Sequence, residues 1–162
     1  MKKQIVRTLL MVATLGLVTS FAVSGCAQSR QRGGGRIEGT WEVQVSIINC
    51  QTGGVIRSFP SLTMFMQGGT VIDSTSGMPQ QLKTPGQGVW AHTTDNNYAF
   101  RFKNFNFDAA NNYTGYTIIR HEANLDVSGD SYTSSGTAET YAANGNLIMN
   151  GCSSTVATRF GL

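Results

Sequence analysis

Residues 37–50 read Ile37-Glu-Gly-Thr-Trp-Glu-Val-Gln-Val-Ser-Ile-Ile-Asn-Cys50 and have the clearest strand pattern in the chain. The odd positions from 37 to 47 carry Ile, Gly, Trp, Val, Val and Ile, whereas the even positions from 38 to 46 carry Glu, Thr, Glu, Gln and Ser. Alternation with a period of two is typical of a β-strand that has one face in a core and the other in water. We therefore expect a strand here, with Trp41 on its buried face.

Seven further stretches have the composition of strands and are separated by turn signals such as Gly68-Gly69 and Asn144-Gly145. Their ranges are 61–67, 71–76, 89–94, 98–107, 113–127, 131–141 and 147–160. Each is joined to its neighbour in the sequence, and no helical pattern follows residue 26. We predict an all-β fold, an eight-stranded antiparallel up-and-down barrel, because closure removes both sheet edges. The aromatic residues of 98–107 stand at even positions up to Phe102 and at odd positions from Phe105. This change in alternation predicts a β-bulge near Lys103-Asn104.

The first residues of the chain have a targeting pattern. A basic start and an apolar run up to Val23 predict a secretory signal peptide over 1–25, too short to be a good membrane-spanning helix. Val23-Ser24-Gly25-Cys26 resembles the lipobox of bacterial lipoproteins, which implies that Cys26 is acylated. The residue after Cys26 is Ala27. In that family, the lack of Asp at this position implies transfer to the outer membrane, where the protein lies on either the periplasmic or the surface face. Ordinary cleavage after Ala27 is the alternative.

Residues 26–36 predict a polar, Gly-rich tether, and 37–162 the barrel domain. The formal net charge of +3 arises in these leading segments, since from Ile37 onward six Lys and Arg stand against nine Asp and Glu. The barrel is therefore acidic, and we expect no nucleic-acid partner.

Cys50 and Cys152 remain once Cys26 is set aside, an even number that suits an oxidising compartment. We predict that they form a disulfide; two reduced, buried thiols are the alternative. If the two residues face each other, the first and last strands pair antiparallel with residue numbers that sum to about 202. Arg159 then lies opposite Val43, one step from Trp41, and the barrel closes.

Gly39-Thr40-Trp41 at the start of the first strand and Arg159 near the end of the last resemble the lipocalin and wider calycin pattern. In that family a Trp plugs the closed end of an eight-stranded barrel and a basic residue packs across it. The resemblance implies that Trp41 and Arg159 form this plug and that the barrel is calycin-like. The absence of a C-terminal helical pattern and the short second strand leave open a neighbouring barrel type, similar to allene oxide cyclase or dirigent proteins.

The long connections 50–60 and 77–88 fall at the end of the barrel opposite the tether. Since long loops usually carry binding function, we expect a mouth there, facing away from the membrane.

Ser134, Gly136 and Ala138 share one strand face, and small inward residues leave space for a ligand; a filled barrel is the alternative. The residues predicted to bind a ligand are Met64, Trp90, Phe100, Phe102, Ile119 and His121. Further apolar residues expected inside are Val43, Val45, Ile47 and Met66.

No phosphate-binding loop, nucleophile elbow or Cys-pair metal site is present in the sequence, so we predict no catalytic residue and no metal site. We expect no cofactor, although an inward His121 could ligate haem. Arg120 and Glu122 flank His121 but point to the opposite face of the strand, which rules out a catalytic trio. His92 is expected at the surface or the rim.

The sequence as a whole predicts a monomeric envelope lipoprotein that binds a small hydrophobic molecule and contacts the membrane only through its lipid. One alternative is a barrel enzyme, a cyclase or isomerase, with His121 as its deep polar group, or Glu139 if that strand faces the other way. The other is a structural or interaction module with a solid core.

Overall fold

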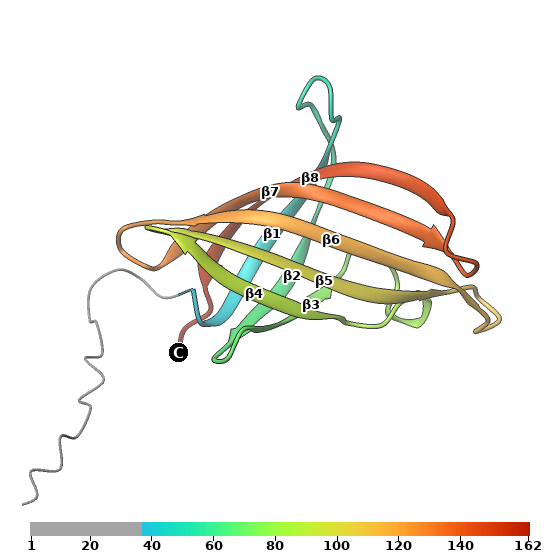
Figure 1. The fold of residues 1–162 in the computed structure, drawn as a ribbon, viewed down its shortest axis with the longest axis horizontal. Coiled ribbons are helices and arrows are strands. Elements are labelled where there is room, and N and C mark those ends of the chain that lie inside the picture. Colours follow the sequence, from blue (N-terminus) through green and yellow to red (C-terminus); the bar gives the residue numbers. More distant parts are fainter. Residues whose placement is uncertain (1–36) are drawn as a thin grey trace, which may run out of the picture. The chain divides into compact units, whose positions relative to one another are not determined.

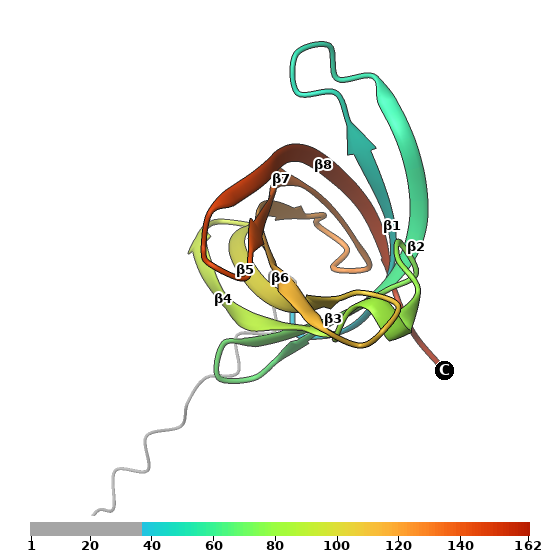
Figure 2. The same ribbon diagram turned by 90° about the vertical axis from the view of Figure 1, so that its right-hand side faces the viewer.

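The computed structural model describes residues 37–162, so the expected signal peptide, Cys26 and the whole tether lie outside the described residues. Eight antiparallel strands form a closed barrel in sequence order, with the last paired to the first (Figures 1 and 2). This confirms the all-β, up-and-down barrel. The strands are β1 (Gly39–Ile48), β2 (Val55–Met66), β3 (Thr70–Thr75), β4 (Gly86–Thr94), β5 (Asn97–Phe107), β6 (Tyr113–Leu125), β7 (Ser131–Ala142) and β8 (Leu147–Arg159).

The β3–β4 connection contains a single 3-10 turn, η1 (Gln80–Leu82). No helix within residues 37–162 is long and apolar enough to cross a membrane.

Strand β2 has 12 residues and begins six residues earlier than expected, and its side chains face the opposite way. It begins at Val55, so the expected connection 50–60 is a short hairpin loop, and β1 and β2 project from the barrel wall as a hairpin (Figures 1 and 2). Thr63 pairs with Trp41, and directly opposed residues share a face. Thr63 therefore points inward, while Met64 is 41% exposed. The expectation that Met64 lies inside was wrong, since the alternating apolar side chains of Leu62 and Met64 lie on the outer face.

No bulge occurs at Lys103-Asn104, where β5 pairs without interruption with β6. Asn104 is buried and points inward, where its amide donates to Asn106 Oδ1 at 2.7 Å. Phe105 lies on the outer face, and the Lys103 ammonium contacts its ring and the Tyr116 ring, at 5.3 and 3.7 Å from their centres. The shift in apolar phase therefore reflects a polar residue inside and an aromatic residue outside.

Trp41 fills the closed end of the barrel. Its side chain is fully buried, its Nε1 donates to Ile37 O at 2.8 Å, and its ring meets Tyr132 edge-on with centroids 4.9 Å apart. Phe65, Val71 and Leu125 complete this packed layer.

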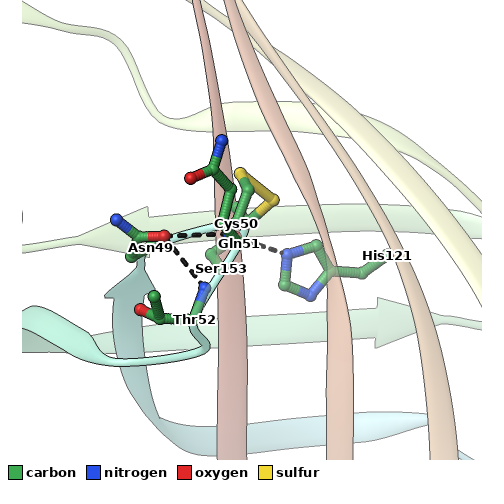
Figure 3. Close-up of a disulfide and its surroundings, with 7 residues drawn as sticks. Asn49, Cys50, Gln51, Thr52, His121 and Ser153 are labelled. Carbon is green, nitrogen blue, oxygen red and sulfur yellow. Dashed lines mark hydrogen bonds between the residues drawn. A yellow bond between two sulfur atoms is a disulfide. The ribbon is translucent and has the colours of Figure 1, made fainter.

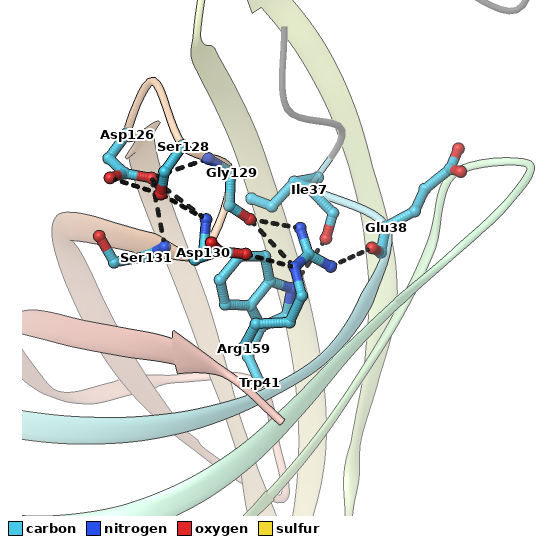
Figure 4. Close-up of polar contacts among 9 residues, drawn as sticks. All are labelled: Ile37, Glu38, Trp41, Asp126, Ser128, Gly129, Asp130, Ser131 and Arg159. Carbon is cyan, nitrogen blue, oxygen red and sulfur yellow. Dashed lines mark hydrogen bonds and ion pairs between the residues drawn. The ribbon is translucent and has the colours of Figure 1, made fainter. Parts of the chain in front are cut away.

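Arg159 lies across the Trp41 ring, with its guanidinium carbon 4.2 Å from the ring centre (Figure 4). It donates from Nη1 to Glu38 O at 2.8 Å and from Nη2 to Gly129 O at 2.7 Å. Arg159 pairs directly with Trp41, not with Val43 as expected. The register differs by two because Cys152 pairs with Ile48, and Cys50 lies in the loop beyond the end of β1.

The predicted disulfide between Cys50 and Cys152 is present, with Cα atoms 5.2 Å apart (Figure 3). Pairing of β1 with β8 ends at Ile48 and Cys152. The disulfide therefore joins the two strands where they begin to separate at the mouth.

We predict that Arg159→Met lowers the free energy of unfolding by about 2–4 kcal/mol, because two carbonyls lose a charged donor and the Trp41 ring loses its cation. Urea unfolding at pH 7, followed by circular dichroism, measures the change. Arg101→Met removes the same charge from the exposed outer face of β5 and should change stability by less than about 0.5 kcal/mol. Equal effects of the two substitutions would contradict a specific role for Arg159.

Candidate functional site

A cavity of about 180 Å³ lies inside the barrel between the closed-end layer and the mouth. Inward side chains of every strand except β4 line it, together with Gly77, Met78 and Lys83 of the β3–β4 connection. Its apolar wall consists of Val43, Val45, Ile47, Phe59, Phe100, Phe102, Ile119 and Ala138. The barrel is therefore packed at one end and hollow at the other.

Four of the six residues predicted to bind a ligand line this cavity: Phe100, Phe102, Ile119 and His121. Met64 lies on the outer face, as described above. Trp90 belongs to the closed-end aromatic cluster, where its ring packs against Phe65 and its Nε1 donates to Met66 O at 2.9 Å. A ligand in the cavity would therefore not reach Trp90.

His121 lies at the centre of a buried hydrogen-bond chain. Its Nδ1 lies 2.7 Å from the Ser134 hydroxyl. Its Nε2 lies 2.7 Å from the Ser153 hydroxyl (Figure 3). Ser134 in turn lies 2.6 Å from the Thr155 hydroxyl. A neutral imidazole offers one donor and one acceptor, so both ring nitrogens are satisfied. Burial lowers the pKa of His121 to about 4, and the ring is therefore neutral at pH 7.

A second polar group was missed by the sequence reasoning. Asp73 is buried, and its Oδ1 accepts hydrogen bonds from Ser61 at 2.7 Å and Thr63 at 2.8 Å. Burial raises the pKa of the Asp73 carboxyl, although the two hydroxyls and the charge of Lys83 act in the opposite direction. Its position two residues after the buried Val71 could have placed it on the inner face.

Lys83 is the other missed residue. It is only 7% exposed, although it lies in a connection between strands. A backbone bridge to Asn106 fixes this segment against the mouth end of β5. Burial lowers the pKa of the Lys83 ammonium, and the charge of Asp73 opposes this effect. No sequence signal within 77–88 indicated an inward cation.

The mouth combines cationic, aromatic and flexible apolar side chains. Arg57 lies over the Phe59 ring at 5.0 Å and donates from Nη2 to Gly77 O at 2.6 Å. Phe59 also packs closely on Gly77, where a β-carbon would lie 2.6 Å from its ring. Met78 and Met149, at 40% and 58% exposed, border the opening.

The cavity of about 180 Å³ does not fit a haem, since sites for drug-sized ligands and cofactors typically measure about 300–1,000 Å³ and only a smaller molecule fits within it. Ligation by His121 would also break one of its two hydrogen bonds. Over residues 37–162, no three His, Cys, Asp or Glu side chains gather closely enough to hold a metal ion.

Glu139 points outward, where its carboxylate accepts hydrogen bonds from Arg120 and from the Tyr141 hydroxyl. It is therefore not the deep polar group that the enzyme alternative required. The polar groups at the cavity wall are those of Arg57, Asp73, Lys83, Asn104, His121 and several hydroxyl-bearing residues. His92 is exposed, as expected.

Hollows of about 570–710 Å³ also occur, but outward residues such as Glu42, Gln44, Arg101 and Glu122 line them. They are depressions of the outer surface, and no buried charged side chain lines them. The internal cavity is the better candidate for a binding site.

Comparison with protein-family models, curated proteins and solved structures found no match to this chain.

We predict that the stability of the wild type falls by about 2 kcal/mol from pH 7 to pH 5, relative to His121→Gln. The folded-state pKa of about 4 lies below the ordinary 6.5, so the unfolded chain binds the proton first as the pH falls. This stability is fully present above pH 6.5 and is lost down to about pH 4.

Urea unfolding of both proteins at the two pH values measures this difference. The Gln side chain can hydrogen-bond to both serines but does not titrate. Titration of Asp73 contributes to the pH dependence of both proteins, so it cancels when they are compared. If both proteins showed the same pH dependence, the desolvation of His121 would be contradicted.

Proposed function

We propose that this protein binds a small hydrophobic molecule inside its barrel. The observation that carries the proposal is the cavity of about 180 Å³ behind the mouth, with an apolar wall of Val, Ile and Phe side chains. A folded domain normally fills its interior to crystal-like density, so a hollow of this size is a feature to be explained. Concave, mainly apolar sites with a few polar groups are typical of ligand pockets.

The size of the cavity limits the ligand. A volume of 180 Å³ is that of about six water molecules in the liquid. It accommodates a short aliphatic chain or a small ring, and a larger ligand would extend through the mouth between Met78 and Met149. Both Met side chains are flexible and adapt to apolar guests of different shapes.

We further propose that the protein is a monomeric, calycin-like lipoprotein of the bacterial envelope, anchored through Cys26 to the outer membrane. The support is the lipobox-like stretch 23–26, the pair of cysteines joined in an oxidised state, and the Trp41–Arg159 contact at the closed end. A disulfide is typical of proteins that fold outside the cytosol. The mouth and the start of the barrel domain at Ile37 lie at opposite ends, so a tethered barrel opens away from its anchor.

We expect the chain from Ala27 onward, exported to the periplasm and never exposed to detergent, to carry a copurified small molecule or to take up 1-hexanol. All eight strands, the core and the disulfide lie within 37–162, so this chain contains the whole fold. Native mass spectrometry detects the added mass, which should disappear on denaturation. Ala138→Leu should reduce occupancy at least tenfold, because three further carbon atoms enter the cavity.

The matched control is Thr137→Leu, which places the same side chain one residue away on the outer face. It should bind as the wild type does. A protein that carries no small molecule and takes up neither 1-hexanol nor hexanoate would contradict the proposal and favour a structural module.

Cys26→Ser in the full chain should move the protein from the membrane pellet to the soluble periplasmic fraction. Mass spectrometry of the wild-type amino-terminal peptide should show an acylated Cys26. A wild type that is itself soluble, with a mature chain that begins after Ala27, would show ordinary signal cleavage instead.

A further inference from the structure

Lys83 carries a charge at the cavity wall with no direct partner among the described residues. Its side chain is more than nine-tenths buried and lines the cavity. Its ammonium makes no hydrogen bond or ion pair with any residue of 37–162; Asp73 acts on it only electrostatically, from a greater distance. No fully buried side-chain polar atom in this part of the chain lacks a hydrogen-bond partner, so the ammonium must border open space.

The cavity differs in charge from the rest of the barrel. Of the six basic and nine acidic residues from Ile37 onward, Arg57, Lys83 and Asp73 line the cavity. The remainder of the domain thus has four basic and eight acidic residues. A cationic interior in an acidic domain favours an anion inside, because charges act more strongly where water is scarce.

The Asp73 carboxylate neutralises the Lys83 ammonium only in part, so it competes only in part with an anionic ligand. The Asp73 carboxyl is already bonded to the hydroxyls of Ser61 and Thr63. It does not contact the ammonium directly, which leaves the three donors of Lys83 available to a ligand.

Strand register places Lys83 on the mouth side of the apolar wall. Lys83 bridges to Asn106, whereas Phe102 and Ile119, which pair with each other, lie deeper in the barrel. An elongated ligand that enters tail first would therefore bring its head group to the level of Lys83.

We propose that the ligand is a short-chain carboxylic acid whose carboxylate pairs with the Lys83 ammonium while its hydrocarbon chain lies against Phe102, Ile119 and Val45. This inference rests on the proposed function, because it names the chemical class of the molecule in the same cavity. Arg57 at the mouth adds a second positive charge on the entry path. The charged contact supplies the orientation, and the apolar wall supplies the remaining affinity.

The test compares hexanoate with 1-hexanol by isothermal titration calorimetry at pH 7, on the chain from Ala27 onward. The two probes have the same six-carbon chain and differ only in the charged head group. The wild type should bind hexanoate at least tenfold more tightly. Lys83→Met should abolish this preference, and Lys103→Met, which removes a lysine from the outer face of β5, should preserve it.

Asp73→Asn provides a second variant with the opposite expected sign. It removes the competing negative charge but keeps an oxygen that can accept from Ser61 and Thr63, so hexanoate should bind several-fold more tightly and 1-hexanol should bind unchanged. Because a variant that folds poorly does not gain affinity, this result supports the inference even if Lys83→Met fails to fold.

Equal binding of the two probes by the wild type would overturn the assignment of Lys83 and leave the proposed function standing. A preference for hexanoate that persists in Lys83→Met would also overturn it. Binding of neither probe would instead contradict the proposed function, so the two failures are distinguishable.

Discussion

The contact between the Trp41 ring and the Arg159 guanidinium closes the barrel at its packed end. It joins the first strand to the last at the closed end and holds the carbonyls of Glu38 and Gly129 with the same side chain. Once these two residues pair, the register of β1 with β8 follows, and with it the inward positions of these two strands. The disulfide holds the same two strands together at the mouth.

The interior that this closure creates is divided into two parts. Large aromatic side chains fill the end around Trp41, whereas small residues of β7 and hydroxyl-bearing residues of β8 leave the other end hollow. Polar groups are accepted there because they satisfy one another, as His121 does with Ser134 and Ser153. The hollow part is thus bordered by polar side chains whose hydrogen bonds are satisfied within the protein.

Two ionisable groups at the wall, Asp73 and Lys83, differ from the rest of the interior. Burying a charge is costly unless it is compensated, and the hydroxyls of Ser61 and Thr63 compensate only the carboxylate. A protein under selection for stability alone would favour an apolar side chain at Lys83. In the complex proposed above, the carboxylate of the ligand would supply the missing counter-charge.

The barrel and its disulfide could be predicted from the amino-acid sequence, because strand alternation and turn signals depend on residues close in the chain, and two cysteines can pair only with each other. The closed end, with Trp41 and Arg159, was implied by the resemblance to the calycin pattern. The amino-acid sequence also placed Phe102, Ile119 and His121 inside. Only the tertiary structure decided that Thr63 faces inward in place of Met64, that Asn104 replaces a bulge, and that Lys83 enters the cavity. Periodicity assumes that polar residues face water, and this assumption fails where an inward polar side chain finds its partner on another strand.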